Sequence, residues 1–179
     1  MTTFNSADKD ADITLSGGDL VAALNSTSTN GCVRATTSKS TGKAFFESTV
    51  TVLTAGGSWR LGLMLATDSL NVQGPASSAG GIEYADGGDI TGPLISDEGD
   101  GFTTGDVIGV AVDFDADLIW FSKNGVWQLG GDSRRGHGRP SHCVEHLLPG
   151  VGRFSCLSAN YWHDQFWRDC LYHITAQRV

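Results

Sequence analysis

The strongest constraint on the fold is a pair of neighbouring runs, the first of which alternates large apolar residues with small or polar ones. The run "DVIGVAVDFD" (Asp106–Asp115) is followed, after Ala116 and Asp117, by "LIWFSKNGVWQ" (Leu118–Gln128). A period of two places successive side chains on opposite faces of a strand, so the first run is typical of a β-strand, and the second completes a hairpin with it. Asp115-Ala116-Asp117 can connect them, and Asn124-Gly125 tolerates the positive φ angles that a tight turn requires. The segment therefore predicts antiparallel strands joined by short turns.

Similar runs recur through the first 132 residues. Ala11–Leu24 contains two short apolar runs separated by Gly17-Gly18, which is a hairpin signal. Further predicted strands lie in Gly31–Gly42, Lys43–Leu53, Trp59–Ala66 and Gly81–Gly92, the last with a turn at Asp86-Gly87. No convincing amphipathic helix is present, and sheet-on-sheet packing is the natural way to bury such strands. We therefore predict an all-β fold, a two-sheet antiparallel β-sandwich.

Length and composition agree with this fold class. A chain of 179 residues suits one domain with a sizeable core, and 24 glycines against four prolines favour a turn-rich β-protein. No stretch approaches the roughly 20 apolar residues that a membrane span needs. The N-terminal "MTTFNSADKDADITL" is acidic and polar, unlike a signal peptide. We expect a protein without membrane contact that stays in the cytoplasm.

The net charge of −8 hides a change of composition near residue 132. Residues 1–132 carry 6 basic and 17 acidic side chains, whereas residues 133–179 carry 6 arginines, no lysine and 3 acidic side chains. All five histidines and three of the four cysteines also lie after residue 132. The acidic first part argues against a nucleic-acid partner, because phosphate binding needs clustered Lys and Arg. We expect a domain at residues 1–132 and a divergent tail at residues 133–179.

The segment "GDVIGVAVDFDADLIWFSKNGVW" resembles the hallmark of SPRY domains, in particular the bacterial and phage-associated kind. "GKAFFES", "WRLGLML" and "GIEYADG" resemble upstream segments of the family in the right order, and "FNSADKDADITLS" resembles the lead-in of bacterial members. The resemblance covers about Phe4–Asp132. It implies a concanavalin-like jelly roll of two curved sheets. It also implies a binding module that holds peptides or protein surfaces in loops at one edge, of phage or prophage origin and virion-associated if phage encoded.

The residues themselves indicate no catalytic chemistry in the first part. Residues 1–132 contain no histidine and one cysteine, Cys32, and show no nucleophile–base pair. Their Gly pairs lack the strand, Gly-rich loop and Lys order of a phosphate site. Asp113, Asp115 and Asp117 alternate as calcium ligands can, although acids around a turn explain them better. We therefore expect no enzyme activity, no cofactor and no metal.

Five residues in or next to predicted loops are candidates for ligand binding: Arg60, Asp68, Tyr84, Asp86 and Trp127. Amphipathic aromatic side chains are good binding anchors when exposed, although packing in the core or at its rim is the plainer interpretation of Tyr84 and Trp127. We assign Trp59 and Trp120 to the core, and Lys123 and Asn124 to a turn.

The expected partner is a protein or peptide. The alternative is a carbohydrate-binding β-sandwich of a virion or surface protein, in which Trp127 and Tyr84 beside acids stack on a sugar ring. The sequence leaves the ligand and the oligomeric state open.

The tail contains many potential zinc ligands but lacks their usual close pairs. They are His142, Cys143, His146, Cys156, His163, Cys170 and His173. "HCVEH" misplaces the Glu of a metalloprotease motif, and no Cys-x-x-Cys occurs. A second interpretation is a selected segment that closes the sandwich or adds an aromatic surface.

The preferred interpretation of the tail is a frameshift. Codons for Tyr161–Cys170 read one nucleotide later permit "TGTINFGATA", similar to the closing strand of SPRY domains, and those for Ser133–Pro140 permit "PAAGTGAP". The shift also accounts for the burst of Arg, His, Cys and Trp without Lys. It predicts an irregular or incomplete C-terminal part with exposed strand edges, and the encoding DNA tests it.

Overall fold

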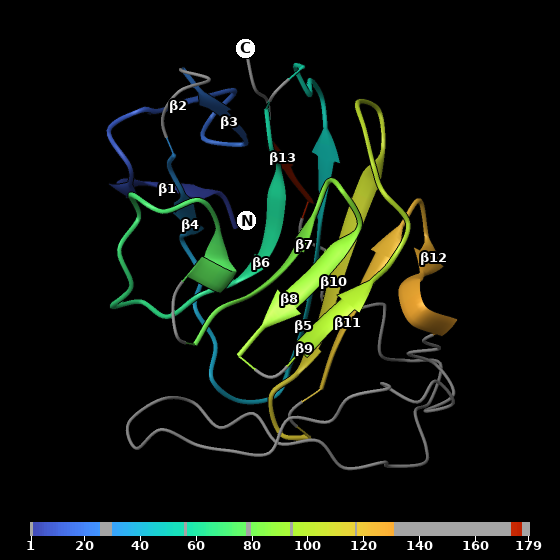
Figure 1. The fold of residues 1–179 in the computed structure, drawn as a ribbon. Coiled ribbons are helices and arrows are strands. Elements are labelled where there is room, and N and C mark those ends of the chain that lie inside the picture. Colours follow the sequence, from blue (N-terminus) through green and yellow to red (C-terminus); the bar gives the residue numbers. More distant parts are fainter. Residues whose placement is uncertain are drawn as a thin grey trace.

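The structure is a computed structural model and describes residues 2–25, 30–55, 57–77, 80–93, 95–116 and 118–130, with the backbone alone at residues 95 and 173–176. Strands and two short 3-10 turns make up its regular structure (Figure 1). The strands are β1 (Phe4–Lys9), β2 (Ile13–Ser16), β3 (Val21–Leu24), β4 (Val33–Ala35), β5 (Lys43–Val50), β6 (Arg60–Leu63), β7 (Ile82–Ala85), β8 (Asp89–Gly92), β9 (Ile95–Glu98), β10 (Val107–Asp113), β11 (Leu118–Lys123), β12 (Val126–Trp127) and β13 (His173–Ala176). The 3-10 turns are η1 (Pro75–Ser77) and η2 (Gln128–Gly130).

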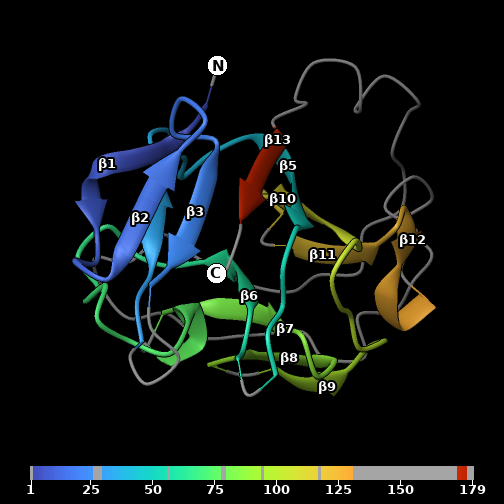
Figure 2. The ribbon, with the colours of Figure 1, turned by 90° about the horizontal axis from the view of Figure 1, so that it is seen from above.

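The strands form two main layers. One is a seven-stranded sheet in the order β12-β11-β10-β5-β13-β3-β2, and the other is a four-stranded sheet in the order β6-β7-β8-β9. β1 and β4 form a separate antiparallel pair. Figure 2 shows the four-stranded sheet lying along one face of the part of the larger sheet that contains β10 and β11. The predicted all-β antiparallel sandwich is confirmed, and the backbone of β13 adds one departure by pairing parallel with both β3 and β5.

Local turn chemistry accounts for the hairpins that the sequence predicts. β10 and β11 pair antiparallel, with Val110 opposite Phe121. Asn124 and Gly125 have φ angles of 50° and 77° at the next turn, as expected for the tight turn into β12. The β2–β3 hairpin likewise turns on glycines with positive φ. β9 was not predicted, because "ISDE" lacks an alternating apolar pattern and forms an edge strand through its pairing with β8.

The main core lies between the two layers. Ile108, Val110 and Val112 project from β10 and are at most 1% exposed, and they pack in one cluster with residues of β5, β7, β8 and β11. Trp59 is 8% exposed in this cluster, which confirms its predicted place. Trp120 was wrongly assigned to this core: its neighbours Ile119 and Phe121 pack there, so the strand period turns Trp120 to the opposite face, half-buried.

A second, smaller cluster lies between β2, β3 and the β1–β4 pair. Its buried members are Phe4, Ile13 and Ala22, and Leu15, Leu24, Val33 and Ala35 pack against them. The described residues therefore contain two hydrophobic clusters, one in the sandwich proper and one beneath the N-terminal strands.

We expect Gly62→Ala to lower the free energy of unfolding by about 1–3 kcal/mol, the usual cost of overpacking a filled site. Gly62 lies in the middle of β6, and a Cβ there would overlap the backbone carbonyl oxygen of Ile82 on β7. Urea denaturation measures the change. Gly87→Ala is the matched control, because a Cβ at Gly87 meets only ordinary contact with Asp89, 3.5 Å away. Equal stability of the two variants would contradict the prediction.

The predictions for the tail lie outside the described residues, apart from the backbone of β13. The domain boundary, the zinc set, the frameshift and the irregular C-terminal part therefore stay predictions.

Candidate functional site

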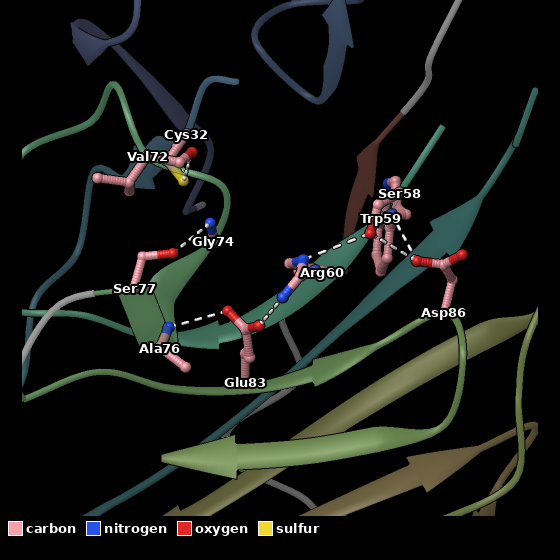
Figure 3. Close-up of polar contacts among 10 residues, drawn as sticks. All are labelled: Cys32, Ser58, Trp59, Arg60, Val72, Gly74, Ala76, Ser77, Glu83 and Asp86. Atoms are coloured by element: carbon pink, nitrogen blue, oxygen red, sulfur yellow. Dashed lines mark hydrogen bonds and ion pairs between the residues drawn. The ribbon is translucent and has the colours of Figure 1, made fainter. Parts of the chain in front are cut away.

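Arg60 and Glu83 form the centre of a polar chain along the β6–β7 pair (Figure 3). Glu83 is 1% exposed, and one carboxylate oxygen is paired with Nη1 of Arg60. Its other oxygen, Oε2, accepts a hydrogen bond of 2.8 Å from the backbone N–H of Ala76 in η1. Gly74 packs so closely on this pair that a Cβ there would overlap both side chains. Arg60 is thus committed to holding a buried carboxylate, and the pair anchors η1 to the four-stranded sheet.

Asp86 belongs to the same network of polar contacts, through the segment just before β6. Its Oδ1 accepts hydrogen bonds from the hydroxyl of Ser58 and the backbone N–H of Trp59, both 2.9 Å long (Figure 3). Nε of Arg60 donates to the same Ser58 hydroxyl at 3.3 Å. The structure therefore brings Arg60 and Asp86 together, in a network that ties the β7–β8 turn to β6.

Asp68 lies apart from this network. Its Oδ2 accepts a hydrogen bond of 2.9 Å from the backbone N–H of Leu65, which closes a turn. Its backbone oxygen accepts a hydrogen bond from Arg34, whose guanidinium is also paired with Asp8 at 2.8 Å. Asp68 thus stabilises the loop after β6, and the structure does not place it beside the other candidates.

Tyr84 is a core residue and not a surface anchor. It is fully buried, its hydroxyl donates to the backbone oxygen of Asp100, and its ring packs edge-on against Phe102 with 4.9 Å between centroids. Burial raises the pKa of its hydroxyl to about 12, and the carboxylates of Asp100 and Asp106 act in the same direction. Packing in the core, the plainer of the two interpretations given for Tyr84 above, is therefore correct, because the alternation of β7 turns its side chain into the sandwich.

Trp127 is the predicted aromatic residue that remains partly exposed, half-buried on β12 and packed edge-on against Phe45. Val126 and Leu129 on either side of it are 65% and 39% exposed, and they are the large exposed hydrophobic residues of the described part of the chain. A shallow depression of about 400 Å³ lies beside Trp127 and Leu129. It is lined by Glu98, Gly99, Asp100, Trp127, Gln128, Leu129 and Gly130, and we call it the Trp127 depression.

One hydrogen bond and one backbone angle define the shape of the Trp127 depression. Oε1 of the buried Gln128 accepts a hydrogen bond of 2.7 Å from the backbone N–H of Asp100, which ties η2 to the loop after β9. Leu129 has a φ of 59°, a left-handed conformation that is unfavourable for a residue with a Cβ. Sequence reasoning missed Gln128 and Leu129. The signal was the apolar Leu129, two residues after Trp127, in a segment too rich in turns to bury it.

A second concavity lies between the layers, where Arg60 forms part of the wall. We call this space of about 580 Å³ the interlayer cavity. Cys32 also lines it, and burial raises the pKa of its thiol to about 11, so Cys32 is a neutral thiol at physiological pH rather than a nucleophile. Most of the other lining residues are apolar.

Asp113 ends β10 and Asp115 lies in the turn that follows, and both carboxylates hold backbone groups there. Asp113 is 1% exposed, its Oδ1 accepts from the backbone N–H groups of Asp115 and Ala116, and its Oδ2 lies 3.4 Å from Nζ of Lys43. Asp115 accepts from the backbone of Gly42 at 2.9 Å. Asp117 lies outside the described residues. Within the described part of the chain, no group of three or more His, Cys, Asp or Glu side chains is arranged to hold a metal ion.

The helical segments of the described residues are single 3-10 turns, and none is long and apolar enough to cross a membrane.

The sequence was compared with protein-family models and with curated proteins. No curated protein matches the chain. The SPRY domain family model matches residues 43–135, which is more than half of the chain. The match begins at β5, so the N-terminal lead-in that also resembles the family lies outside it. SPRY domains are generally protein-interaction modules. The matched segment contains β5 to β12, and the chain therefore belongs to the SPRY domain family.

Proposed function

We propose that this protein is a non-catalytic module that binds a protein or peptide segment at the Trp127 depression. The observation that supports this most is the exposed side chain of Leu129 in the depression, two residues after the half-buried Trp127 that also lines it. An exposed apolar group and an aromatic ring in one depression are suited to anchoring a partner.

The charges around the depression indicate the chemistry of the partner. Glu98 and Asp100 lie on its wall, and Asp89 stands directly opposite Glu98 on β8. Like charges directly opposite one another in a sheet repel, and a cation from a partner relieves that repulsion. We therefore propose a segment that places one apolar side chain beside Leu129 and one Lys or Arg side chain near Glu98.

The depression is organised before any partner arrives. The backbone N–H of Asp100 is bonded to Gln128, and its backbone oxygen accepts from the buried Tyr84 hydroxyl. A loop held at both groups loses little conformational entropy on binding, which favours affinity.

The carbohydrate alternative required Trp127 and Tyr84 to stack on a sugar ring, and Tyr84 is fully buried and cannot do so. A phage or prophage origin, with a cytoplasmic or virion-associated location, stays part of the proposal on the resemblance to bacterial members alone.

Selection from a displayed random-peptide library tests the proposal. We expect selected peptides to combine an apolar residue with Lys or Arg. Trp127→Ala is expected to weaken their binding about 30-fold, as for a central aromatic anchor. Leu129→Gly removes the side chain while suiting the positive φ, so affinity should fall about tenfold without loss of thermal stability.

The control is Lys39→Ala, an exposed position outside the depression. If neither Trp127→Ala nor Leu129→Gly changes the affinity of the selected peptides, the binding surface lies elsewhere. Binding on a glycan array that depends on Trp127, with no peptide selected, would favour the carbohydrate alternative.

A further inference from the structure

Asn124 and Gly125 form a chemically labile pair at the turn between β11 and β12. Both residues are exposed, and their φ angles are 50° and 77°. Asparagine is among the thermolabile residues, and it deamidates when the next backbone nitrogen attacks its side-chain Cγ. Because glycine has no Cβ, the nitrogen of Gly125 is not shielded by a side chain. This pair is therefore a candidate site of deamidation.

The reaction at this pair needs no co-reactant other than water. A bond forms between the Gly125 nitrogen and Cγ of Asn124, and the bond from Cγ to Nδ2 breaks. The proton of the Gly125 N–H ends on the departing nitrogen, which leaves as ammonia, and a succinimide ring remains. Water then opens the ring at either carbonyl carbon, which gives aspartate or isoaspartate. Isoaspartate adds one carbon atom to the backbone of the turn.

The folded hairpin holds the Asn124 amide away from this reaction. Its Nδ2 donates a hydrogen bond of 2.7 Å to Oδ1 of Asp106, and its Oδ1 accepts one of 2.9 Å from the backbone N–H of Val107. Expulsion of Nδ2 breaks the bond to Asp106, and turning Cγ toward the Gly125 nitrogen carries Oδ1 away from Val107. Deamidation therefore requires the hairpin to open locally.

Either product prevents the hairpin from closing as before. A carboxylate has no N–H to donate, so it places a negative charge against Asp106 where a hydrogen bond stood. The backbone N–H of Thr103 and the side chain of Asn124 lower the pKa of Asp106, so its carboxylate is ionised at neutral pH. β12 pairs with β11 directly after the turn, from Val126 onward, and an added backbone carbon shifts that register.

We propose that Asn124 is a deamidation site that the folded hairpin protects, and that its conversion to aspartate or isoaspartate detaches β12 from β11. Opening of the hairpin permits the modification, and the modification then keeps the hairpin open. The proposal does not depend on peptide binding, although Trp127 lies on the strand that is released.

Peptide-resolved mass spectrometry of the full chain, incubated in mildly alkaline buffer with and without urea, tests the protection. Asn30-Gly31, the other Asn-Gly pair of the chain, is the internal reference, and in urea both pairs should react at similar rates. Without urea, Asn124 should react about 100-fold more slowly than in urea, as expected for two hydrogen bonds of which one is to a charged group. Equal rates at Asn124 in the folded and unfolded chain would overturn the proposal, as would no reaction at Asn124 in urea.

Asp106→Ala removes the acceptor of Nδ2 and should speed the deamidation of Asn124 in the folded chain about tenfold. Asp115→Ala is the matched control, because Asp115 also accepts a hydrogen bond from a backbone N–H, that of Gly42, but at a different turn. Its Asn124 should react at the rate of the parent. An Asn124 that reacts no faster in Asp106→Ala would show that this contact does not protect it.

Asn124→Asp reproduces the aspartate product, and hydrogen exchange measures its effect on β12. Protection of residues 122–130 should fall about tenfold, as expected for the loss of a hydrogen bond to a charged group. Asn71→Asp makes the same change of charge elsewhere, because Nδ2 of Asn71 donates to Oδ2 of Asp10 at 3.1 Å, and it should leave residues 122–130 as protected as in the parent. Unchanged protection of residues 122–130 in Asn124→Asp would contradict the release of β12.

Discussion

Replacing Glu83 by Ala is expected to lower the free energy of unfolding by about 3–5 kcal/mol, the usual cost of removing one partner from a buried ion pair. The carboxylate is 1% exposed and satisfies both the guanidinium of Arg60 and the backbone N–H of Ala76. Its removal leaves a largely buried cation and an unsatisfied amide, and it releases η1 from β7. Urea denaturation at neutral pH measures the loss.

The matched control is Glu98→Ala, an exposed carboxylate on the edge strand β9 that faces Asp89. Its removal relieves a like-charge pair and should change stability by less than about 0.5 kcal/mol. A double-mutant cycle with Arg60→Ala isolates the pair itself. A loss below about 1 kcal/mol for Glu83→Ala would mean that the carboxylate is not buried as the structure shows.

The second large effect is alkaline destabilisation through Tyr84. Its pKa is about 12 in the folded protein against an ordinary value of 10, so the hydroxyl ionises more readily in the unfolded chain. The stabilisation is fully present below pH 10 and is lost between about pH 10 and pH 12, at about 1.4 kcal/mol for each pKa unit, or about 3 kcal/mol in all. Denaturation curves across this range measure the loss.

Tyr84→Phe isolates this contribution. At neutral pH the variant should be less stable than the parent by about 1 kcal/mol, because the backbone oxygen of Asp100 loses its donor. Above pH 10 the parent loses stability faster, so the two curves should converge and cross. Cys32, whose raised pKa acts in the same direction between about pH 9 and pH 11, is present in both proteins and cancels. Parallel curves would show that Tyr84 ionises as freely in the folded chain as in the unfolded one.

The strands with local signals were predictable. The alternation in β10, the Asn124-Gly125 turn and the glycine turn between β2 and β3 act over a few residues, and all appear where the sequence places them. β9 was not predictable, because its own residues do not favour a strand and its pairing with β8 decides its conformation.

The candidate site was predicted less well than the strands. Arg60 and Asp86 lie in loops or at strand ends as expected, but each is held by partners that the sequence does not identify, Glu83 and Ser58 among them. From the sequence, Tyr84 and Trp127 could each be an exposed binding anchor or a residue packed in the core or at its rim. The register of the sheets buried the first and left the second at the surface.

The sequence by itself determined the fold class, most of the strands and turns, and the membership of a binding-module family, because alternation, turn chemistry and ordered motifs are local properties of the chain. Only the tertiary structure decided which face of each strand is buried. It turned Trp120 away from the core, enclosed Glu83 and Ser48, and brought the loop of Asp100 against η2. These outcomes depend on how the two sheets pack, and residues far apart in the sequence set that packing together.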